Sequence, residues 1–593
     1  MPRKIIEENA VKEIEWRQWG REAFDGARRQ NKPVLLSISA VWCHWCHVMD
    51  QTSYSAPQVI DYINENFIPV RVDNDQRPDI NERYNMGGWP SAAFLTPDGY
   101  ILQGCTYLPP EQFLALAKQT KELYETNQAG IDKIVQPLET PPTAEEKGLA
   151  EEPEKFYKKV IEEAFSALGE MYDPLYGGFG WQPKFPNADF IRFLMLHHHV
   201  TGNENSLRMV RKTLEEMGRG GVYDKVEDGF FRYSTTPDWA APHYEKMLSD
   251  NSELLALYCD MYLITGEEAF REKARGIVRY MMNRLYDNLG GGFWGSQDAD
   301  EEYYALGLEE RNKRKVPAID RRKFADWNGL AVAAMLKAAA ITGEKSLEDA
   351  AIKTLTYLKA SVIDSTLNVK HAAGEEGKGR LRDLVNVAAA SLAAHEHTGD
   401  TRHLGDCVML AQTLMTQFWD KEAGGLFDVK ADPGAIGYLR YRLKSVRDNA
   451  KAAELLVKLH LATEDDAYGF IALHILQALY KRNKEFNMET PAYASAAIIL
   501  MQPHFALRIA GRLDDEVSRK FRMAAANFYE PRLTVQFIDL TRERTQREKL
   551  GMRENDAPAA FLCDATSCRE RIARPEQIAE AAASVITSSG TSG

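Results

Sequence analysis

The stretch "VLLSISAVWCHWCHVMD", residues 34–50, joins a short apolar run to two cysteines and two histidines. The run from Val34 to Ser39 has the length and composition of a buried strand. Cys43 and Cys46 follow it at a Cys-x-x-Cys spacing, which is found in c-type haem attachment, in zinc sites and in redox-active dithiols. The letters of the motif alone do not choose among these three chemistries.

The chemical context of the motif weighs against haem and zinc. Haem attachment normally takes place outside the cytoplasm, and we identify no companion axial methionine. A structural zinc site needs two ligands beyond the cysteine pair, and only His47 and the distant Cys105 offer themselves. A further interpretation is that the cysteines have no chemical role and are only small, packed hydrophobic residues.

The helices and strands expected around the motif favour the interpretation as a redox-active dithiol. The sequence predicts a helix over residues 19–30, a strand at 34–39, a helix from about 55 to 67, a strand at 68–73, a hairpin with strands at 92–96 and 100–104, and a helix from 110 to about 124. This order, with a dithiol between the first strand and a helix, is that of an α/β thioredoxin-like domain. Trp89-Pro90 stands where that fold carries a cis-proline facing the dithiol.

A cysteine at a helix N-terminus lies near unpaired backbone N–H groups and the positive end of the helix dipole, and both favour its thiolate. We therefore expect Cys43 to be the nucleophile and Cys46, which we expect to be less exposed, to resolve the mixed disulfide. His44 would add positive charge between them. The predicted substrate contacts around this catalytic pair are Trp42, His44, Trp89 and Pro90.

Composition excludes several classes of protein. The 593 residues carry a formal net charge of −13, so no general attraction to nucleic acid or to anionic lipid is expected. The N-terminal residues lack the apolar core of a secretory signal, and no apolar run is long enough to cross a membrane. Seven cysteines do not make a secreted disulfide scaffold. We expect a cytoplasmic protein with no resident cofactor or metal.

Beyond a proline-rich, acidic linker at 136–154, the chain becomes helical and repetitive. An Asn or Asp precedes a threonine by 14 or 15 residues at five places, and each interval is apolar at helical period. A second motif alternates with the first: "YDPLYGGF", "YDKVEDGF", "YDNLGGGF" and "WDKEAGGL", at 172, 223, 286 and 419. Paired helices with glycine turns on one side predict an all-α (α/α)6 toroid. The expected domains are 1–135, thioredoxin-like, and 155–593, the barrel with a C-terminal tail.

Such a ring has a central cavity lined by the starts of its inner helices. Carboxylates, a histidine and aromatic residues are expected there. Enzymes that act on sugars use carboxylates and histidines for proton transfer and aromatic rings for stacking on the sugar. His243 and Glu245 are the predicted catalytic pair of the barrel. The predicted substrate-binding residues are Lys246, Asp298, Asp300, Asp326, Trp327 and Asn328.

Structural roles compete with these assignments. Asp250, Asp326, Asp383 and Asp448 each lie near a predicted helix start, where aspartate often caps the helix. Aromatic residues of the turns, such as Trp327, often serve only to pack the rim.

The motifs "CHWCHVM" at 43–49, "GGWP" at 87–90, "PHYEKML" at 242–248, "QDAD" at 297–300 and "DWNGL" at 326–330 resemble those of one family. This is the spermatogenesis-associated, thioredoxin-domain-containing family, which joins a thioredoxin-like domain to a barrel similar to six-hairpin glycosidases and N-acylglucosamine 2-epimerases. The resemblance implies redox behaviour for the first half and carbohydrate-related chemistry for the second. Cys563 and Cys568 match the family's C-terminal cysteine pair. The segment "RDNAKAAELL" at 447–456 departs from the family pattern, which has Pro-Ser-Gly-Asn there.

The leading hypothesis is a thiol–disulfide oxidoreductase module fused to a carbohydrate-binding or carbohydrate-processing barrel. Its expected partners are a protein dithiol and a small sugar, without nucleic acid or membrane. One alternative is a sugar epimerase, isomerase or glycoside hydrolase with a structural thioredoxin-like domain. Another is a non-catalytic interaction protein.

Overall fold

The computed structural model describes residues 12–127, 130–131, 153–374, 379–480, 487–563 and 568–589. It divides into two compact units. The N-terminal unit combines Met1–Glu146 with Ala431–Arg442, and the C-terminal unit combines Lys147–Lys430 with Leu443–Gly593. The predicted linker at 136–154 lies almost entirely outside the described residues.

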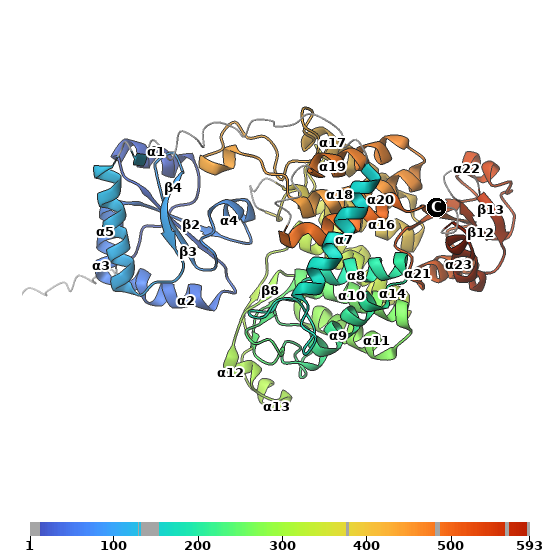
Figure 1. The fold of residues 1–593 in the computed structure, drawn as a ribbon, viewed down its shortest axis with the longest axis horizontal. Helices are drawn as coiled ribbons and strands as arrows, with labels where there is room; N and C mark the ends of the chain where they lie inside the picture. Colours follow the sequence, from blue (N-terminus) through green and yellow to red (C-terminus); the bar gives the residue numbers. More distant parts are fainter. Residues whose placement is uncertain are drawn as a thin grey trace, which may run out of the picture. The chain divides into compact units, whose positions relative to one another are not determined.

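The N-terminal unit is built on a four-stranded sheet in the order β2-β1-β3-β4 (Figure 1). Strand β1 is parallel to β2 and antiparallel to β3, and β3 and β4 form the predicted hairpin. The strands are β1 (Val34–Ser39), β2 (Ile68–Asp73), β3 (Ser91–Leu95) and β4 (Ile101–Cys105), and the helices are α1 (Arg21–Gln30), α2 (His44–Gln51), α3 (Pro57–Asn66), α4 (Pro78–Tyr84) and α5 (Pro110–Thr126), with a short turn η1 (Ser53–Ser55).

Alternation along β1 explains why helices cover both faces of this sheet. Leu36 belongs to a core formed with α1 and α4, whereas its neighbour Leu35 belongs to a second core formed with α2, α3 and α5. The unit is therefore a three-layer α/β/α fold. The thioredoxin-like class predicted from the sequence is confirmed.

A segment from far along the chain completes this unit. Ile436, next to the short turn η3 (Gly437–Arg440), joins the core on the α1 and α4 side. The Tyr84 hydroxyl donates to the Gly99 carbonyl at 2.8 Å and accepts the N–H of Tyr438 at 2.9 Å. Sequence reasoning did not find this segment.

The C-terminal unit contains six inner helices, among the described residues, that contact one another in a closed ring. Each inner helix packs against an outer helix, and α7 pairs with the last inner helix, α20. The predicted (α/α)6 toroid is thus confirmed. The inner helices are α8 (Ala188–Thr201), α10 (Leu248–Thr265), α14 (Ala325–Thr342), α16 (Leu381–Thr398), α18 (Val446–Thr463) and α20 (Thr490–Met501), and the outer helices are α7 (Pro153–Met171), α9 (Glu204–Arg219), α11 (Glu268–Tyr280), α15 (Lys345–Ser361), α17 (Thr401–Gln417) and α19 (Asp466–Tyr480).

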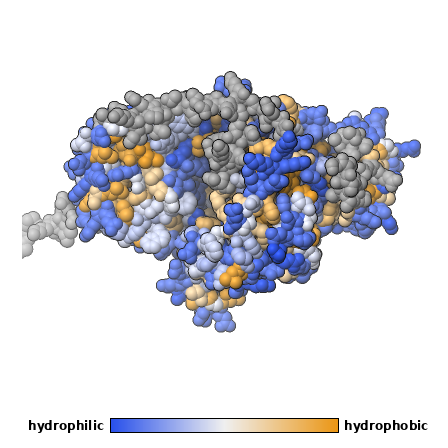
Figure 2. Space-filling model, in the orientation of Figure 1, coloured by the Kyte–Doolittle hydropathy of each residue, from blue (hydrophilic) through white to orange (hydrophobic). Residues whose placement is uncertain are grey.

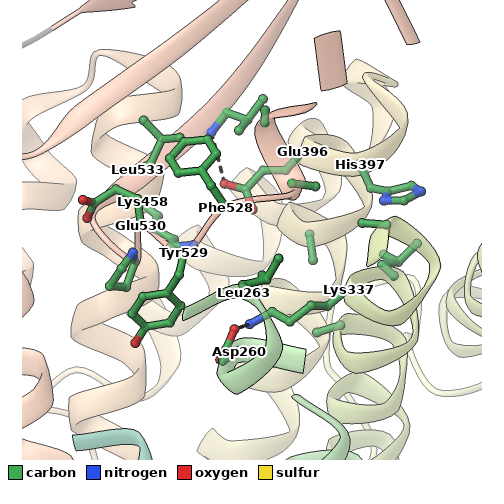
Figure 3. Close-up of a pocket in the computed structure, with 18 of the residues that line it drawn as sticks. Asp260, Leu263, Lys337, Glu396, His397, Lys458, Phe528, Tyr529, Glu530 and Leu533 are labelled. Carbon is green, nitrogen blue, oxygen red and sulfur yellow. Dashed lines mark hydrogen bonds and ion pairs between the residues drawn. The ribbon is translucent and has the colours of Figure 1, made fainter. Parts of the chain in front are cut away.

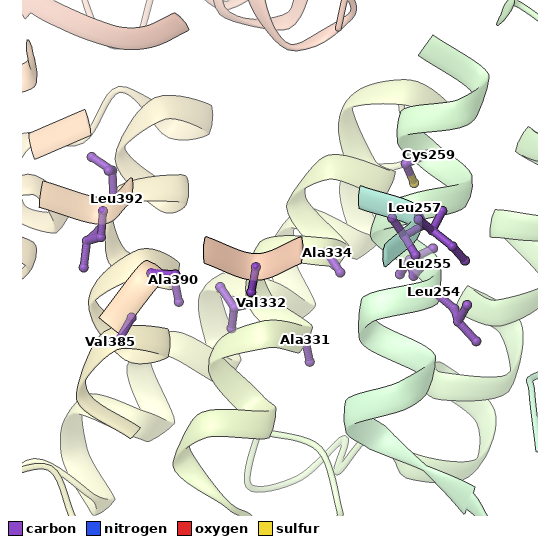
Figure 4. Packing of buried hydrophobic residues seen from close by; sticks show 14 of the residues in the cluster. Leu254, Leu255, Leu257, Cys259, Ala331, Val332, Ala334, Val385, Ala390 and Leu392 are labelled. Carbon is purple, nitrogen blue, oxygen red and sulfur yellow. The ribbon is translucent and has the colours of Figure 1, made fainter. Parts of the chain in front are cut away.

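Alanines allow the inner helices to approach closely. Ala331 and Ala334 of α14, Ala390 of α16, and leucines of α10 lie in one buried cluster (Figure 4). At the C-terminal ends of α10 and α14, Gly266 and Gly343 end the helices in the left-handed region, with φ of 69° and 73°. The Thr-Gly repeat of the sequence is therefore a repeated helix stop. Hydrophilic residues dominate the surface of this unit on the face that Figure 2 shows.

Each aromatic-Asp turn is held by a lysine that is buried or half-buried. In the first turn, Asp173 Oδ1 accepts the N–H groups of Leu175 and Tyr176. Its Oδ2 accepts from Lys184 Nζ at 2.6 Å, and that ammonium also donates to the Gly177 carbonyl at 2.9 Å. The same arrangement joins Asp224 to Lys246, Asp287 to Lys323 and Asp420 to Lys444. We call these four pairs the turn clamps.

The repeated asparagines fasten the turns to the inner helices. Asn328 Oδ1 accepts the Phe293 N–H at 2.7 Å, and its Nδ2 donates to the carbonyls of Phe293 and Phe324. Asn251 and Asn449 repeat this pattern on Phe230 and Leu426. These amides are fully buried and their hydrogen bonds stay within the fold; we call the three residues the asparagine clamps.

Residues 505–589 form an α/β domain where the sequence analysis expected only a tail. Its sheet has the order β11-β10-β12-β13, with the same parallel and antiparallel pairings as the sheet of the N-terminal unit. The alternating strands "FALRIAG" and "LTVQFID" on either side of a helix were the missed signal. The elements are β10 (Phe505–Gly511), α21 (Glu516–Ala526), β11 (Leu533–Asp539), α22 (Arg544–Lys549), β12 (Ala559–Cys563), β13 (Cys568–Ile572), η6 (Pro575–Gln577) and α23 (Ile578–Ser589).

Short elements lie in the loops that lead to the inner helices. Strand β6 pairs with β5, and β8 pairs with both β7 and β9. They are β5 (Tyr233–Ser234), β6 (Pro242–His243), β7 (Lys246–Met247), β8 (Ser296–Gln297), β9 (Ile319–Asp320), η2 (Met281–Leu285), α12 (Glu301–Tyr304), α13 (Leu308–Arg311) and η5 (Asn487–Glu489).

The asparagine clamps give a stability prediction. Asn328→Ala removes three buried hydrogen bonds and leaves backbone groups of Phe293 without partners, so we expect a loss of about 2–4 kcal/mol in the free energy of unfolding. Thermal or urea unfolding measures it. Asn205→Ala, at an exposed position of α9, is the matched control and should change stability by less than about 0.5 kcal/mol. Equal stability of the two variants would contradict the clamp.

Candidate functional site

The dithiol lies where β1 passes into α2. Cys43 is the N-cap residue of α2, and its Sγ accepts the N–H of Cys46 at 3.2 Å. The two sulfurs form a disulfide. Cys43 and Cys46 are 4% and 3% exposed, so the predicted difference in exposure between them is small. The sulfur of Cys43 thus sits against a helix N-terminus, the position that favours a thiolate.

Trp42 directly precedes Cys43, and its ring contacts that of Trp89, which precedes a cis-proline. The Trp89-Pro90 peptide bond is cis, as the fold predicted, and directly precedes β3. The rings of Trp42 and Trp89 meet edge to face, with centroids 5.7 Å apart. Trp42 is buried, and its Nε1 donates to the buried carboxylate of Asp75 at 2.7 Å. Trp42 and Trp89 therefore contact each other immediately beside Cys43, and sequence reasoning missed Asp75.

The histidines of the motif differ in their surroundings. His44 is exposed, and its ring meets that of Trp45 at 5.9 Å. His47 contacts the Val41 carbonyl through Nε2 at 3.0 Å. Burial raises the pKa of the Cys105 thiol to about 11, which disfavours the thiolate that a metal needs.

A cavity of about 320 Å³ opens at the starts of the inner helices. Its charged lining comes from three inner helices and one loop. Arg447 of α18 forms ion pairs with Asp189 of α8 and, at 2.6 Å, with Glu253 of α10. The complete lining is Phe185, Pro186, Asn187, Ala188, Asp189, Phe190, Arg232, Asp250, Glu253, Leu254, Arg447 and Met488.

Asp250 is the acidic group of this cavity that can hold a proton. Burial raises its pKa to about 7, and the neighbouring Glu253 carboxylate adds to the effect against the opposing influence of Arg232. The N-cap of α10 is Met247, so Asp250 does not cap the helix. A carboxyl group that titrates near neutrality in a cavity is suited to general acid or base catalysis.

An aromatic stack leads from the cavity to the predicted catalytic pair. The Phe185 ring stacks on Tyr233 at 4.6 Å, and Tyr233 stacks on His243 at 4.9 Å. His243 Nδ1 lies 2.5 Å from Glu245 Oε2. The structure therefore brings His243 and Glu245 together, next to the cavity rather than in its lining. Exposed aromatic faces such as Phe185 can stack on a sugar ring.

The other predicted barrel residues lie outside this lining. Lys246 is fully buried in a turn clamp, and Asn328 is an asparagine clamp. Asp300 caps α12 by accepting the Tyr303 N–H, and Asp298 accepts the N–H of Ala299. The Trp327 ring packs on Phe324 at 4.8 Å. Sequence reasoning missed Arg232, Glu253, Asp189 and Arg447, although Asp250 and Glu253 stand one helical turn apart, which was a readable signal.

Asp326 belongs to a buried cluster with His371 and Asp383. Their ligand atoms all lie within 4.8 Å of one another, the spacing of a metal-binding group. His371 Nδ1 contacts Asp383 Oδ1 at 2.8 Å. Burial alone would lower the pKa of His371, but the Asp383 carboxylate outweighs it and raises the value to about 9. At neutral pH the cluster thus holds its own cation, an imidazolium between two carboxyl groups.

A second cavity, of about 290 Å³, lies at the opposite ends of the inner helices, against the α/β domain of residues 505–589 (Figure 3). Asp260 and Lys337 form an ion pair on its wall, as do Arg192 and Glu454. Glu396 accepts the N–H of Val535 at 3.2 Å. Most of its charged groups are thus already paired within the fold.

Comparison with known proteins finds a family model for the N-terminal region and relatives that cover nearly the whole chain. Residues 4–140 match a family model described as "Protein of unknown function, DUF255". The chain is 26% identical to human spermatogenesis-associated protein 20, over 97% of this chain and 91% of the human protein. The resemblance to the spermatogenesis-associated family is confirmed. An uncharacterised protein of Caenorhabditis elegans is 35% identical over 49% of this chain and 42% of its own length.

Other similarities concern single parts. The thiol:disulfide interchange protein DsbD of Pseudomonas fluorescens is 35% identical over 13% of this chain and 14% of its own length. Among solved structures, D-mannose isomerase aligns with 57% of this chain and 87% of its own, at 13% identity and a TM-score of 0.45. A family 76 α-mannanase of Bacteroides thetaiotaomicron aligns with 58% of this chain and 98% of its own, at 14% identity and a TM-score of 0.43. The family model and the packing of the described helices and strands together make the chain a fusion of a thioredoxin-like domain and a helical toroid.

None of the described helices combines the length and the apolar character that crossing a membrane requires.

The buried histidine cluster gives a pH prediction. A pKa raised from its ordinary value of 6.5 to about 9 contributes stability that is complete below pH 6.5 and is lost as the pH rises through 9. The melting temperature of the chain should therefore fall between pH 7 and pH 10. In His371→Gln the starting value is lower and the fall is smaller. If the melting temperature falls by the same amount in both proteins between pH 7 and pH 10, the role of His371 is refuted.

Proposed function

We propose that this chain is a thiol–disulfide oxidoreductase that exchanges disulfides with protein partners through Cys43 and Cys46. The observation that carries the proposal is the Cys43 sulfur at the N-terminus of α2, accepting the N–H of Cys46. The similarity of this region to a protein named thiol:disulfide interchange protein supports it. Location in the cytoplasm stays a prediction.

The reduced form would act by two exchange steps. The Cys43 thiolate attacks one sulfur of the partner's disulfide, and the partner's other sulfur leaves with the electron pair and takes up a proton. Cys46, as thiolate, then attacks the Cys43 sulfur, which forms the intramolecular disulfide and releases the partner's second thiol. The partner gains two electrons and the chain returns to the disulfide form seen here.

Exposed side chains around the dithiol suit a polypeptide partner. Val41 and Trp45 are 43% and 48% exposed, which is unusual for residues of this type, and the Trp45 ring contacts Tyr107. Apolar side chains beside a buried sulfur can bind the segment that carries the partner's disulfide. We assign Val41 and Trp45 to this contact, together with His44.

Insulin reduction tests the proposal. Cys43→Ser should abolish the reduction of insulin by dithiothreitol that the chain catalyses, whereas Cys46→Ser should accumulate a mixed disulfide on Cys43, visible on a non-reducing gel. Cys105→Ser is the matched control, because Cys105 lies on β4 outside the dithiol and should leave the rate unchanged. Wild-type activity in Cys43→Ser would refute the assignment.

A second candidate function belongs to the toroid, where one observation favours it. Asp250 titrates near pH 7 in a cavity that also presents the face of Phe185. We propose that this cavity binds a small sugar and that Asp250 exchanges a proton with it, with His243 and Glu245 positioned by the aromatic stack. Asp189, Glu253 and Arg447 would offer hydrogen bonds to hydroxyl groups.

A panel of reducing mono- and disaccharides tests the second candidate. A sugar that raises the melting temperature identifies the ligand, and proton NMR then follows its conversion. Asp250→Asn should retain binding but lower the rate of conversion by about 100-fold or more. Asp466→Asn, whose carboxylate is fully exposed on α19, should behave as wild type. If no sugar of the panel changes the melting temperature and the chain exchanges no disulfide, both proposals are contradicted and the alternative of a non-catalytic interaction protein is favoured.

A further inference from the structure

A second disulfide lies in the α/β domain of residues 505–589. Cys563 ends β12 and Cys568 begins β13, and the two residues face each other in the register of this hairpin. Cys563 is 2% exposed, whereas Cys568 is exposed on β13, the edge strand of the sheet. One sulfur of the pair is thus open to attack, while the other lies in the core.

This disulfide does little to hold the chain together. Only four residues separate its cysteines, so it closes a very short loop and removes little entropy from the unfolded chain. The strands it joins are also paired by their own backbone hydrogen bonds, and β12 is anchored on its other side by β10. A staple for this domain would be expected between elements that are distant in sequence.

The charge around Cys568 favours its thiolate. Arg508 of β10 directs Nη1 to within 3.7 Å of the Cys568 sulfur, and its other terminal nitrogen pairs with Glu464. Lys549 shares the same carboxylate at 2.7 Å, which leaves a net positive charge in the group. A guanidinium beside a sulfur stabilises the anion released when a disulfide opens.

The remaining cysteines have no comparable setting. Burial raises the pKa of the Cys259 and Cys407 thiols far above their ordinary value, and both side chains are fully covered. Cys105 is half-buried, and its pKa is also raised. Apart from Cys43 and Cys46, the cysteines best placed for thiol chemistry are therefore Cys563 and Cys568.

We propose that Cys563–Cys568 is a second exchangeable disulfide of this chain, reduced by thiol compounds at Cys568, with Arg508 as the residue that positions and stabilises the released thiolate. The proposal does not depend on the chemistry assigned to Cys43. It gives the C-terminal α/β domain a redox role, although the loop after β10, at the position of the dithiol in the N-terminal sheet, carries no cysteine.

The exchange balances with two thiols. A thiolate attacks the Cys568 sulfur, the disulfide bond breaks, and its electron pair goes to Cys563, which takes up a proton. The Cys563 thiol can then donate to the Phe561 carbonyl, 3.7 Å away. A second thiolate attacks the reductant sulfur on Cys568 and frees the Cys568 thiolate beside Arg508. The reductant leaves as its disulfide, and the chain has gained two electrons.

The test uses the full chain with Cys43→Ser and Cys46→Ser, so that Cys563–Cys568 is its sole disulfide. The folded protein is equilibrated with mixtures of reduced and oxidised glutathione and then labelled with a maleimide polymer, without denaturant. We expect labelling of Cys568, located by peptide mapping, to grow as the mixture becomes more reducing. Labelling that appears only after unfolding would show a structural disulfide and would overturn the proposal.

A charge variant tests the role of Arg508. After reduction of the Cys563–Cys568 disulfide, Arg508→Gln in the same background should slow alkylation of Cys568 by iodoacetamide at pH 7 about two- to fivefold, because the thiolate loses a partly exposed positive neighbour. The matched control is Arg512→Gln, an exposed arginine that pairs with Asp514. Circular dichroism verifies that both variants are folded. Equal alkylation rates, or an equal loss in both variants, would remove Arg508 from the site.

Discussion

The ion pair between an aspartate and a lysine in each turn clamp is the contact on which the toroid depends. In each turn clamp the carboxylate organises the glycine turn through two backbone N–H groups, and the ammonium fixes that turn to the loop that leads into the next inner helix. In the two fully buried clamps, Asp173–Lys184 and Asp224–Lys246, removing one partner leaves an uncompensated charge in the core, which costs about 3–5 kcal/mol. Four clamps therefore set where the inner helices begin, and with them the shape of the cavity mouth.

This constraint also explains why the most visible motifs of the barrel lie in its turns and not in the lining of the cavity. The residues that recur most visibly, the aspartates, lysines and asparagines of the clamps, recur because every turn needs them. The charged groups that line the cavity occur once each: Arg232 in a loop, Asp189, Asp250 and Glu253 on α8 and α10, and Arg447 on α18. Periodicity in a repeat protein thus identifies the frame, whereas departures from periodicity mark the candidate site.

Much of the fold could be predicted because local rules agreed with tertiary structure. Strands β1 and β2 occupy the predicted residues, since apolar runs of strand length are bounded there by Pro33 and by the polar Asn74. The pairing of His243 with Glu245 followed from their closeness in sequence. Arg447 could not be assigned to Asp189 in this way, because that contact joins α18 to α8 across the ring and no local pattern encodes it. The sheet of residues 505–572 was within reach of the strand rules but was passed over as a tail.

The return of Ala431–Arg442 to the N-terminal unit makes the thioredoxin-like domain discontinuous in sequence. The chain crosses between its two units three times, near residues 146, 430 and 442. A fragment cut after residue 135 would lack Ile436 and the N–H of Tyr438, so its core would be open on the side of α1 and α4 and the Tyr84 hydroxyl would lose a donor. The thioredoxin-like domain is therefore not a continuous segment that precedes the barrel, and a single cut in the chain cannot separate the two units.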